Sequence, residues 1–262
     1  MSTDFLIVMR KDLDEVMRNR YIVSSMATFP VLFSIVIPLL YLFTVPANVT
    51  EADVAALGNV LHGYAGMTPR QAMIAFLVQS NLPFYLLMPG VMPTLIAAYS
   101  IAGEKKNGTL EPMLATPVKT SDILLGKTLA AVVPSVLITW ISFIVYMALI
   151  NTVTSRSFGF SIVPDPQWAV ALAITGPLIA ILSVYASIMV SARMSDVRAA
   201  QQVSAALVVP IMGLFVLQLF GMITLSLDII VAISAALFVL DIVLIRIGTL
   251  LFRRDEILTT WG

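Results

Sequence analysis

Two ionisable residues, Asp241 and Arg246, stand inside a long apolar stretch near the end of the chain. A charge deep in a membrane span is costly, so it is by default a candidate functional residue. Asp241 either lines a translocation path or bonds a hydroxyl group on a neighbouring helix. Arg246 is five residues further on, so the two do not share a helical face well, and its side chain is near enough to the inner surface to reach water. We consider both as candidate path residues.

Other chemistry is poorly supported by the residue types present. An aspartic protease needs two facing carboxylates, but Asp228 and Asp241 stand about 20 Å apart along one helix. His62 is the only histidine and there is no cysteine, and one histidine makes no metal site. Residues 126–128, Gly-Lys-Thr, resemble the end of a phosphate-binding loop, yet Ser121 stands where that motif requires glycine. We predict no catalytic residue, no metal site and no cofactor bound by this chain.

The composition is that of a membrane protein. Of the 262 residues, 59% are hydrophobic and only 11% are charged, whereas a soluble domain carries about 25% charged residues. A soluble fold of this size could not hide so much apolar surface. We therefore predict an all-α polytopic membrane protein that sits in the lipid bilayer. The net charge of zero gives no reason to expect a nucleic-acid partner.

Six apolar segments are long enough to cross a bilayer, which takes about 20 helical residues. They are residues 22–45, 82–102, 129–150, 168–190, 203–220 and 229–252. Residues 1–21 precede them, and within residues 4–18 apolar side chains recur at helical spacing with charges on the other face. This amphipathic helix either lies in the membrane interface or packs on its own protein.

Prolines and capping residues predict the local shape of several segments. Pro30 and Pro38 should kink the first span. Four helix breakers stand in the second span: Pro83, Pro89, Gly90 and Pro93. We expect this span to be kinked or partly unwound at its outer end. Between the two spans, Thr50 and Thr68 are good helix caps, and each would begin a short helix.

The positive charges predict which side each loop faces. Twelve lysines and arginines fall in the N-terminal segment, the linker after the second span, the 191–202 loop and the C-terminal tail, against two in the longer loops opposite. Such an excess marks the cytoplasmic side. Six spans put both termini on one side. We therefore expect a multi-pass protein of the cell membrane, with both termini and the central linker, residues 103–128, in the cytoplasm.

The central linker is the strongest functional signal in the sequence. Residues 104–127 hold four lysines. Four further residues break or turn helices: Gly108, Pro112, Pro117 and Gly126. Thr109 is a good cap for a short helix that must stop before Pro117, and Glu104 and Glu111 offer negative charge to a partner's basic residues. A short, rigid element joined closely to two spans suits a partner ATPase that pushes on it; the alternative is an ordinary solvated loop.

The same stretch resembles the signature of ABC exporter permeases of the second type. The resemblance lies in an acidic residue, a GTLE element, a TPV turn and an ILLGK helix start. These are Glu104, residues 108–111, residues 116–118 and residues 123–127. The six predicted spans, the cytoplasmic termini and the N-terminal amphipathic helix extend the resemblance over most of the chain.

The resemblance implies a permease that pairs with a second permease, identical or related, and binds two copies of a cytoplasmic ABC ATPase that holds ATP and Mg²⁺. It places the family's coupling helix on residues 108–114 and the path along the second and fifth spans. It marks eight residues for ATPase coupling: Glu104, Gly108, Thr109, Leu110, Glu111, Pro117, Gly126 and Lys127. Residues 220–228 leave little room for the re-entrant helices of many members, and the 46–80 loop could compensate.

We therefore predict a transport subunit rather than an enzyme: the permease of an ATP-driven exporter, working as a dimer in efflux. ATP binding by the partner would push residues 108–114 and shift the permease between inward and outward states. The alternative is a self-sufficient ion-coupled transporter or channel that relies on Asp241 and needs no ATPase. The apolar spans suit a hydrophobic or amphiphilic cargo, and a drug, a lipid, an ion and a cofactor all stay open.

Overall fold

The computed structural model describes most of the chain, with gaps in the loops and at both ends. The described residues are 4–55, 66–109, 112–113, 116, 118–159, 161–193, 202, 206, 208–220, 222–223 and 225–251. All regular elements among them are helices. The prediction of an all-α polytopic protein is therefore confirmed. Several predicted features lie outside the described residues, including His62, Leu110, Glu111, Pro117 and the C-terminal tail.

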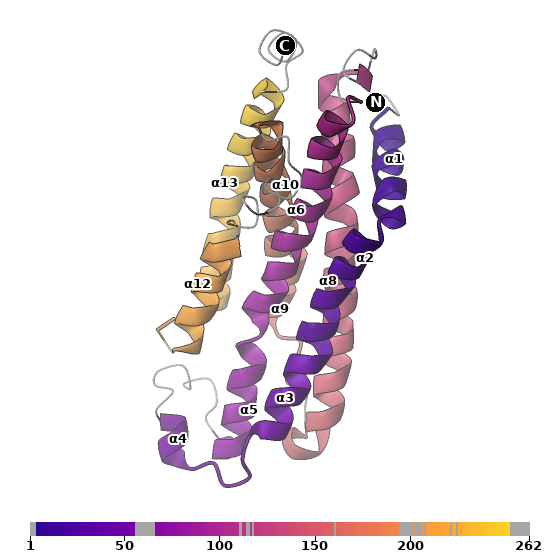
Figure 1. Ribbon diagram of the computed structural model, residues 1–262. Coiled ribbons are helices and arrows are strands. Elements are labelled where there is room, and N and C mark those ends of the chain that lie inside the picture. Colours follow the sequence, from indigo (N-terminus) through magenta and orange to yellow (C-terminus); the bar gives the residue numbers. More distant parts are fainter. Residues whose placement is uncertain are drawn as a thin grey trace.

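Long helices run roughly side by side and make up the bundle (Figure 1). The N-terminal part comprises α1 (Asp4–Arg18), α2 (Arg20–Val31), η1 (Leu32–Val36) and α3 (Ile37–Thr44). The next comprises α4 (Glu51–Ala55), α5 (Pro69–Gln79), α6 (Leu82–Lys106) and α8 (Thr120–Phe158). The last comprises α9 (Pro166–Val170), η3 (Ala171–Thr175), α10 (Gly176–Arg193), α12 (Val208–Leu219) and α13 (Leu227–Leu251).

Five helical segments of the described part are long and apolar enough to cross a membrane. They are Arg20–Thr44, Pro69–Ser100, Thr120–Ser155, Pro166–Ser191 and Leu227–Thr249. Each overlaps one predicted span. The predicted span 203–220 corresponds to α12, which has only 12 residues and is shorter than the roughly 20 residues that a crossing needs. A sixth crossing stays a prediction.

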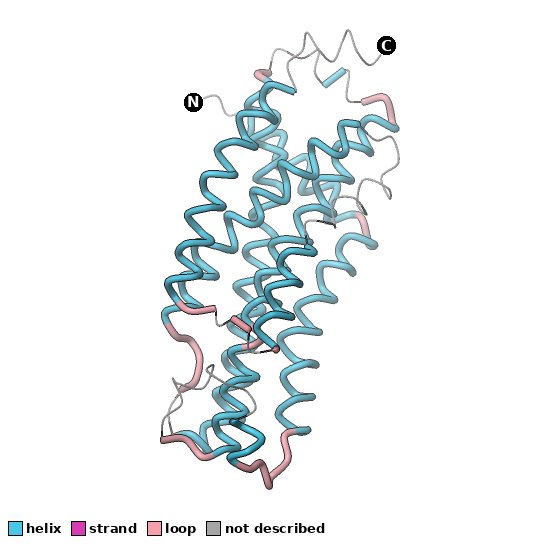
Figure 2. The backbone as a smooth tube through the Cα atoms, turned by 90° about the vertical axis from the view of Figure 1, so that its left-hand side faces the viewer, coloured by secondary structure: helices cyan, strands magenta, loops and turns pink. Residues whose placement is uncertain are grey.

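The two ends of the bundle differ in what they carry. Figure 1 places α1, the end of α6, the start of α8 and the end of α13 at one end, and α4 with the end of α8 at the other. Figure 2 shows the same long axis after a quarter turn. The first end, which we call the linker end, therefore holds the N-terminal charges together with the charges of the central linker, as the charge pattern predicts for one side of a membrane.

Two widened helical turns occur directly before prolines. The N–H of Ile37 donates to the carbonyl of Leu32, and the N–H of Gly176 donates to that of Ala171. Each bond spans five residues, and a proline follows at position 38 or 177. Proline has no N–H and cannot continue the normal ladder, so the wider turn keeps the backbone bonded in a medium without water. The irregularity predicted for the first span thus takes the form of a π-helical turn.

The second span is more regular than predicted. α6 is helical without interruption from Leu82 to Lys106, with Pro89 and Pro93 inside it. Of the two forms expected for its outer end, kinked or partly unwound, the unwound one is wrong. Pro83 stands in the first turn, where no backbone donor is needed, and the helix break comes earlier, at Ser80 and Asn81 between α5 and α6.

Both predicted caps of the outer loop are confirmed. Thr68 Oγ1 accepts a hydrogen bond from the N–H of Gln71, and Gln71 Oε1 accepts one from the N–H of Thr68, so the two form a capping box. Thr50 accepts from the N–H of Asp53, whose carboxylate accepts from Thr50 in turn. These bonds start α5 and α4.

A cluster of aromatic side chains fills the bundle between α6, α8 and α9. Trp168 is fully buried and stacks on Tyr146 and Phe143, with ring centroids 5.6 and 5.1 Å away. Its indole N–H donates to Gln79 Oε1 at 2.8 Å. A buried tryptophan adds a large apolar contact, and the hydrogen bond of its N–H fixes the orientation of its ring. This cluster therefore holds α9 against α5, α6 and α8.

Trp168→Ala should destabilise the protein strongly, because it removes the largest fully buried side chain and leaves a cavity. We expect a loss of about 3–5 kcal/mol in the free energy of unfolding, measured by thermal or denaturant unfolding in detergent. Phe238→Ala is the matched control, since Phe238 is 56% exposed on α13 and its loss should cost little. Equal effects of the two substitutions would contradict this packing.

Candidate functional site

The site lies at the linker end of the bundle, where α1 crosses the start of α8. α1 ends at Arg18 because Asn19 caps α2, its side chain accepting from the N–H groups of Tyr21 and Ile22. The face of α1 toward the bundle buries Asp12 and Val16. The sequence left two interpretations for this amphipathic helix: it lies in the membrane interface, or it packs on its own protein. The face that carries Asp12 and Val16 packs on the protein.

Gly126 sets how closely α1 and α8 approach. A Cβ atom at this position would lie 2.6 Å from the carbonyl oxygen of Phe5 and 2.8 Å from Cβ of Val8. Real Cβ atoms do not come so close to another backbone, so only glycine fits here without moving α1. The glycine of the ILLGK element is thus required by a helix contact.

Lys127, one residue further along, carries a buried positive charge. Its Nζ lies 3.2 Å from Asp12 Oδ2 and 2.8 Å from Glu104 Oε2, and it donates to Ser100 Oγ at 2.6 Å. Ser100 Oγ in turn donates to Asp12 Oδ2 at 2.6 Å. The side chains of Lys127, Asp12 and Glu104 are at most 6% exposed. One ammonium group therefore joins α1, α6 and α8.

A second lysine closes the cluster toward solvent. Lys11 Nζ is hydrogen-bonded to Glu104 Oε1 at 2.5 Å and lies 3.6 Å from Asp12 Oδ1 and 3.4 Å from Glu15 Oε1. Partial burial opposes the charged form of Lys11, but the hydrogen bond and negative charge of Glu104, with Asp12 and Glu15, raise its pKa above the usual range. A lysine whose pKa is raised by folding stabilises the fold at all pH values below the pKa of an unperturbed lysine. Lys11 is therefore positively charged at neutral pH.

We call these five residues, Lys11, Asp12, Glu15, Glu104 and Lys127, together with Ser100, the charge cluster. Desolvating a lysine and two carboxylates is costly, and the mutual attraction of buried charges often only offsets that cost. Removing one member is a different matter, because it leaves a buried charge unpaired. We infer that the cluster fixes the relative position of three helices more than it adds net stability.

The linker begins directly at the charge cluster. The carbonyl of Glu104 accepts from both the N–H and the hydroxyl of Thr109, at 3.0 and 3.4 Å. Between them Gly108 adopts φ +67°, a left-handed conformation that favours glycine. The carbonyl of Thr109 then accepts from the N–H of Met113 at 3.2 Å. Thr109 was predicted to cap a helix through its side chain, but its hydroxyl bonds back to α6.

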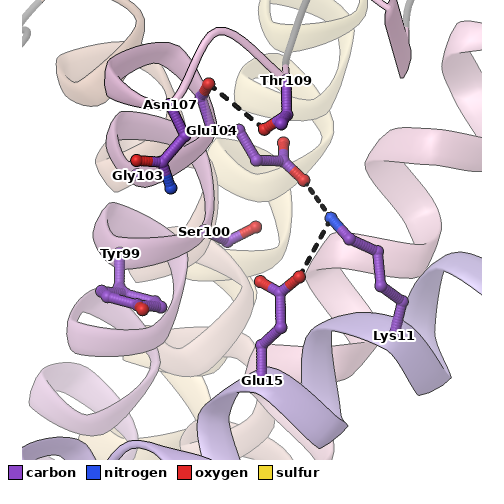
Figure 3. A pocket seen from close by; sticks show the side chains of 8 residues that line it. All are labelled: Lys11, Glu15, Tyr99, Ser100, Gly103, Glu104, Asn107 and Thr109. Carbon is purple, nitrogen blue, oxygen red and sulfur yellow. Dashed lines mark hydrogen bonds and ion pairs between the residues drawn. The ribbon is translucent and has the colours of Figure 1, made fainter.

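A small cavity of about 170 Å³ opens beside the charge cluster (Figure 3). Its lining comprises Lys11, Glu15, Tyr99, Ser100, Gly103, Glu104, Asn107 and Thr109. The close-up shows Lys11 bridging Glu104 and Glu15 across this space. The cavity therefore lies between α1, the end of α6 and the first turn of the linker, where a movement of the linker would be felt by both helices.

The structure brings together five of the eight residues that the sequence marked for coupling. Glu104, Gly108, Thr109, Gly126 and Lys127 all lie at the linker end. The expectation that Glu104 offers its charge to a partner is not supported, because both carboxylate oxygens face lysines of the same chain. The other three, Leu110, Glu111 and Pro117, lie outside the described residues.

The two candidate path residues lie elsewhere and apart from each other. Asp241 is buried in α13, whereas Arg246 is exposed on another face of the same helix. Sequence reasoning missed Lys11, Asp12 and Ser100. Asp12 had a readable signal, since it shares a helical stripe with Val8 and Val16, four residues away on either side, and an acid on an apolar stripe needs a partner.

Lys127→Met should destabilise the protein by about 3–5 kcal/mol, because Asp12 and Glu104 would lose their buried cation and keep only Lys11, whose side chain is 45% exposed. Unfolding in detergent measures this, with the exposed Lys119→Met as the control. Neutralising the acids as well, in Lys127→Met with Asp12→Asn and Glu104→Gln, should restore much of the loss. If the triple variant is less stable than the single one, the unpaired charges are not the cause.

Gly126→Val should release α1 from α8, because the new side chain would collide with the backbone at Phe5. We expect hydrogen exchange in residues 5–16 to rise at least about tenfold, the factor that 1.4 kcal/mol of opening free energy gives. Gly103→Ala is the control, since nothing lies within 4 Å of the added Cβ. Unchanged exchange in α1 would show that the close contact is not needed.

Comparison with protein families assigns nearly the whole chain. Residues 6–252 match the model described as ABC-2 family transporter protein. Comparison with curated proteins finds no match. The family match spans α1, the charge cluster, the linker and every predicted span, and it confirms the resemblance seen in residues 104–127. The chain belongs to the ABC-2 family of transporter proteins.

Proposed function

We propose that this ABC-2 family permease is driven by a separate cytoplasmic ATPase that pushes on residues 108–114 of the central linker, and that it works as an exporter. Family membership makes the chain a membrane permease component of an ABC transporter. The observation that carries the finer proposal is the charge cluster. It joins the two helices that hold the linker, α6 and α8, to α1 through one buried lysine.

The cluster suits the transmission of a push. A force on residues 108–114 acts on the end of α6 and the start of α8, and the Lys127 bridge conveys it to α1. α8 has 39 residues, a length of about 58 Å at 1.5 Å per residue. A tilt at its linker end therefore displaces side chains at the opposite end of the bundle. Energetic coupling between distant sites is carried by rigid elements that can adopt two discrete positions, and α8 would be such an element.

The partner would supply all nucleotide chemistry. We propose that the ATPase holds ATP and Mg²⁺ and meets the exposed turn at Asn107 and Gly108, and that the linker end is cytoplasmic, as the excess of lysine and arginine there predicts. The ATP-bound and ATP-free forms of the ATPase would bind the two conformations of the permease with different affinities. ATP binding would then shift the equilibrium between these conformations.

A second permease copy, identical or related, completes the proposal. The second span does not offer a free face in a single chain, because α6 is largely buried against α8, α10 and α12. α12 does, and exposed apolar side chains recur at helical spacing along α12 and just after its end: Val209, Met212, Val216, Leu217 and Phe220. We propose that this face meets the partner permease, with the path between them.

The sharpest test compares two glycines of the same conformation. Gly108 and Gly66 both have positive φ, +67° and +89°, and a β-branched residue at either is strained by about 1–2 kcal/mol. Only Gly108 lies in the linker. Gly108→Val should reduce permease-stimulated ATP hydrolysis about tenfold or more, and Glu111→Lys should weaken ATPase binding, whereas Gly66→Val should leave both unchanged.

The measurement is ATP hydrolysis by the co-purified ATPase in lipid nanodiscs, with and without the permease. If no ATPase associates with the wild-type chain, or if Gly108→Val and Gly66→Val behave alike, the linker is an ordinary loop. The self-sufficient ion-coupled transporter would then take its place, favoured by the buried carboxyl group of Asp241.

A further inference from the structure

Asp241 lies in the seam where α13 packs on α10. Among the side chains of α13 that are described, the buried ones form a single line: Ile230, Ser234, Asp241 and Gly248. Their spacing of four or seven residues puts them on one helical face. Asp241 is 3% exposed, and neither carboxyl oxygen has a hydrogen-bond partner within the described part of the chain. The group therefore points into the protein and makes no hydrogen bond with the described residues.

The neighbours of Asp241 along the seam are neutral. Toward the start of α13, Ser234 Oγ and Thr175 Oγ1 share a hydrogen bond of 2.8 Å. Toward the linker end, the ring of Tyr185 packs on Gly248, where an added Cβ would lie 2.9 Å from the ring. Tyr185 also hydrogen-bonds with the side chain of Thr128 on α8. Its ring thus lies between Asp241 and the linker end of the bundle.

No positive charge compensates Asp241 among the described residues. Of the elements that pack on α13, namely α8, α9, η3 and α10, the ionisable side chain that interacts with Asp241 is Tyr185. Arg246 is exposed on a different face. An ionised carboxylate without a partner costs many kcal/mol in an apolar medium, and such groups take up a proton instead.

A proton suits this place better than a metal ion does. Metal cations such as Ca²⁺ or Mg²⁺ need six or more oxygen ligands, and the described residues contain no group of three acidic, histidine or cysteine side chains that could hold one. One carboxyl group suffices for a proton. Among its described residues, the seam offers that group and no second carboxylate.

We propose that Asp241 is a proton-binding site of this permease. In the conformation described here it is a carboxylic acid. When α13 separates from α10 and water enters the seam, the O–H bond breaks, the proton passes to water, and a hydrated carboxylate remains; closure of the seam reverses the step. The protonated state stands on the geometry alone, whereas proton exchange during transport rests on the proposed function.

Infrared spectroscopy of the purified permease in nanodiscs tests the protonated state directly. At pH 7 the wild type should show the carbonyl band of a buried, protonated carboxyl group. Asp241→Asn should abolish this band and Asp241→Glu should shift it, while Asp228→Asn, which changes an exposed acid at the start of the same helix, should leave it unchanged. Addition of Na⁺ should not remove it.

If the wild type lacks the carbonyl band, the proposal is wrong, and no variant is needed to show it. If the band is present but disappears when Na⁺ is added, the site binds a metal cation instead of a proton. The exchange step is tested with the ATPase bound. ATP should diminish the band in the wild type. A band that stays constant while ATP hydrolysis is still stimulated by the permease would overturn proton exchange and leave the proposed function intact.

Discussion

Burial of the Lys127 ammonium group at the meeting point of three helices is the constraint on which the linker end depends. The group cannot be left unpaired away from water, so Asp12 of α1 and Glu104 of α6 must both stay beside it. This requirement brings α1 onto α8, and Gly126 provides the space. The position of the linker follows, because the carbonyl of Glu104 also fixes Thr109.

The opposite half of the bundle is held by different forces. There Trp168, Tyr146 and Phe143 stack in an aromatic cluster, and Gln79 Oε1 accepts from the neutral indole N–H of Trp168. The α10–α13 seam is held by neither: there the carboxyl group of Asp241 is buried without a hydrogen-bond partner among the described residues.

Composition and periodicity sufficed to predict the all-α membrane fold, the amphipathic N-terminal helix and the caps at Thr50 and Thr68, because these depend on local sequence. They failed where the cause is distant. Glu104 was assigned to a partner protein, but its carboxylate pairs with Lys127 of the same chain, 23 residues away. Asp12 pairs with the same lysine across 115 residues. Four helix breakers, two of them Pro89 and Pro93, predicted a kinked or partly unwound second span, yet surrounding helices and the lack of water keep α6 helical. Asp241 was visible as a charge in a span, but its isolation was not.

The central claim is that the charge cluster moves as one body when the linker is pushed. The chain has no cysteine, so spin labels can be placed at will on exposed positions. Electron–electron distances in the ATPase complex would compare Arg10→Cys with Ser121→Cys, across the α1–α8 contact, and Arg10→Cys with Phe238→Cys, between α1 and α13. On addition of ATP the first distance should stay constant and the second should change. A first distance that changes as much as the second would contradict the account.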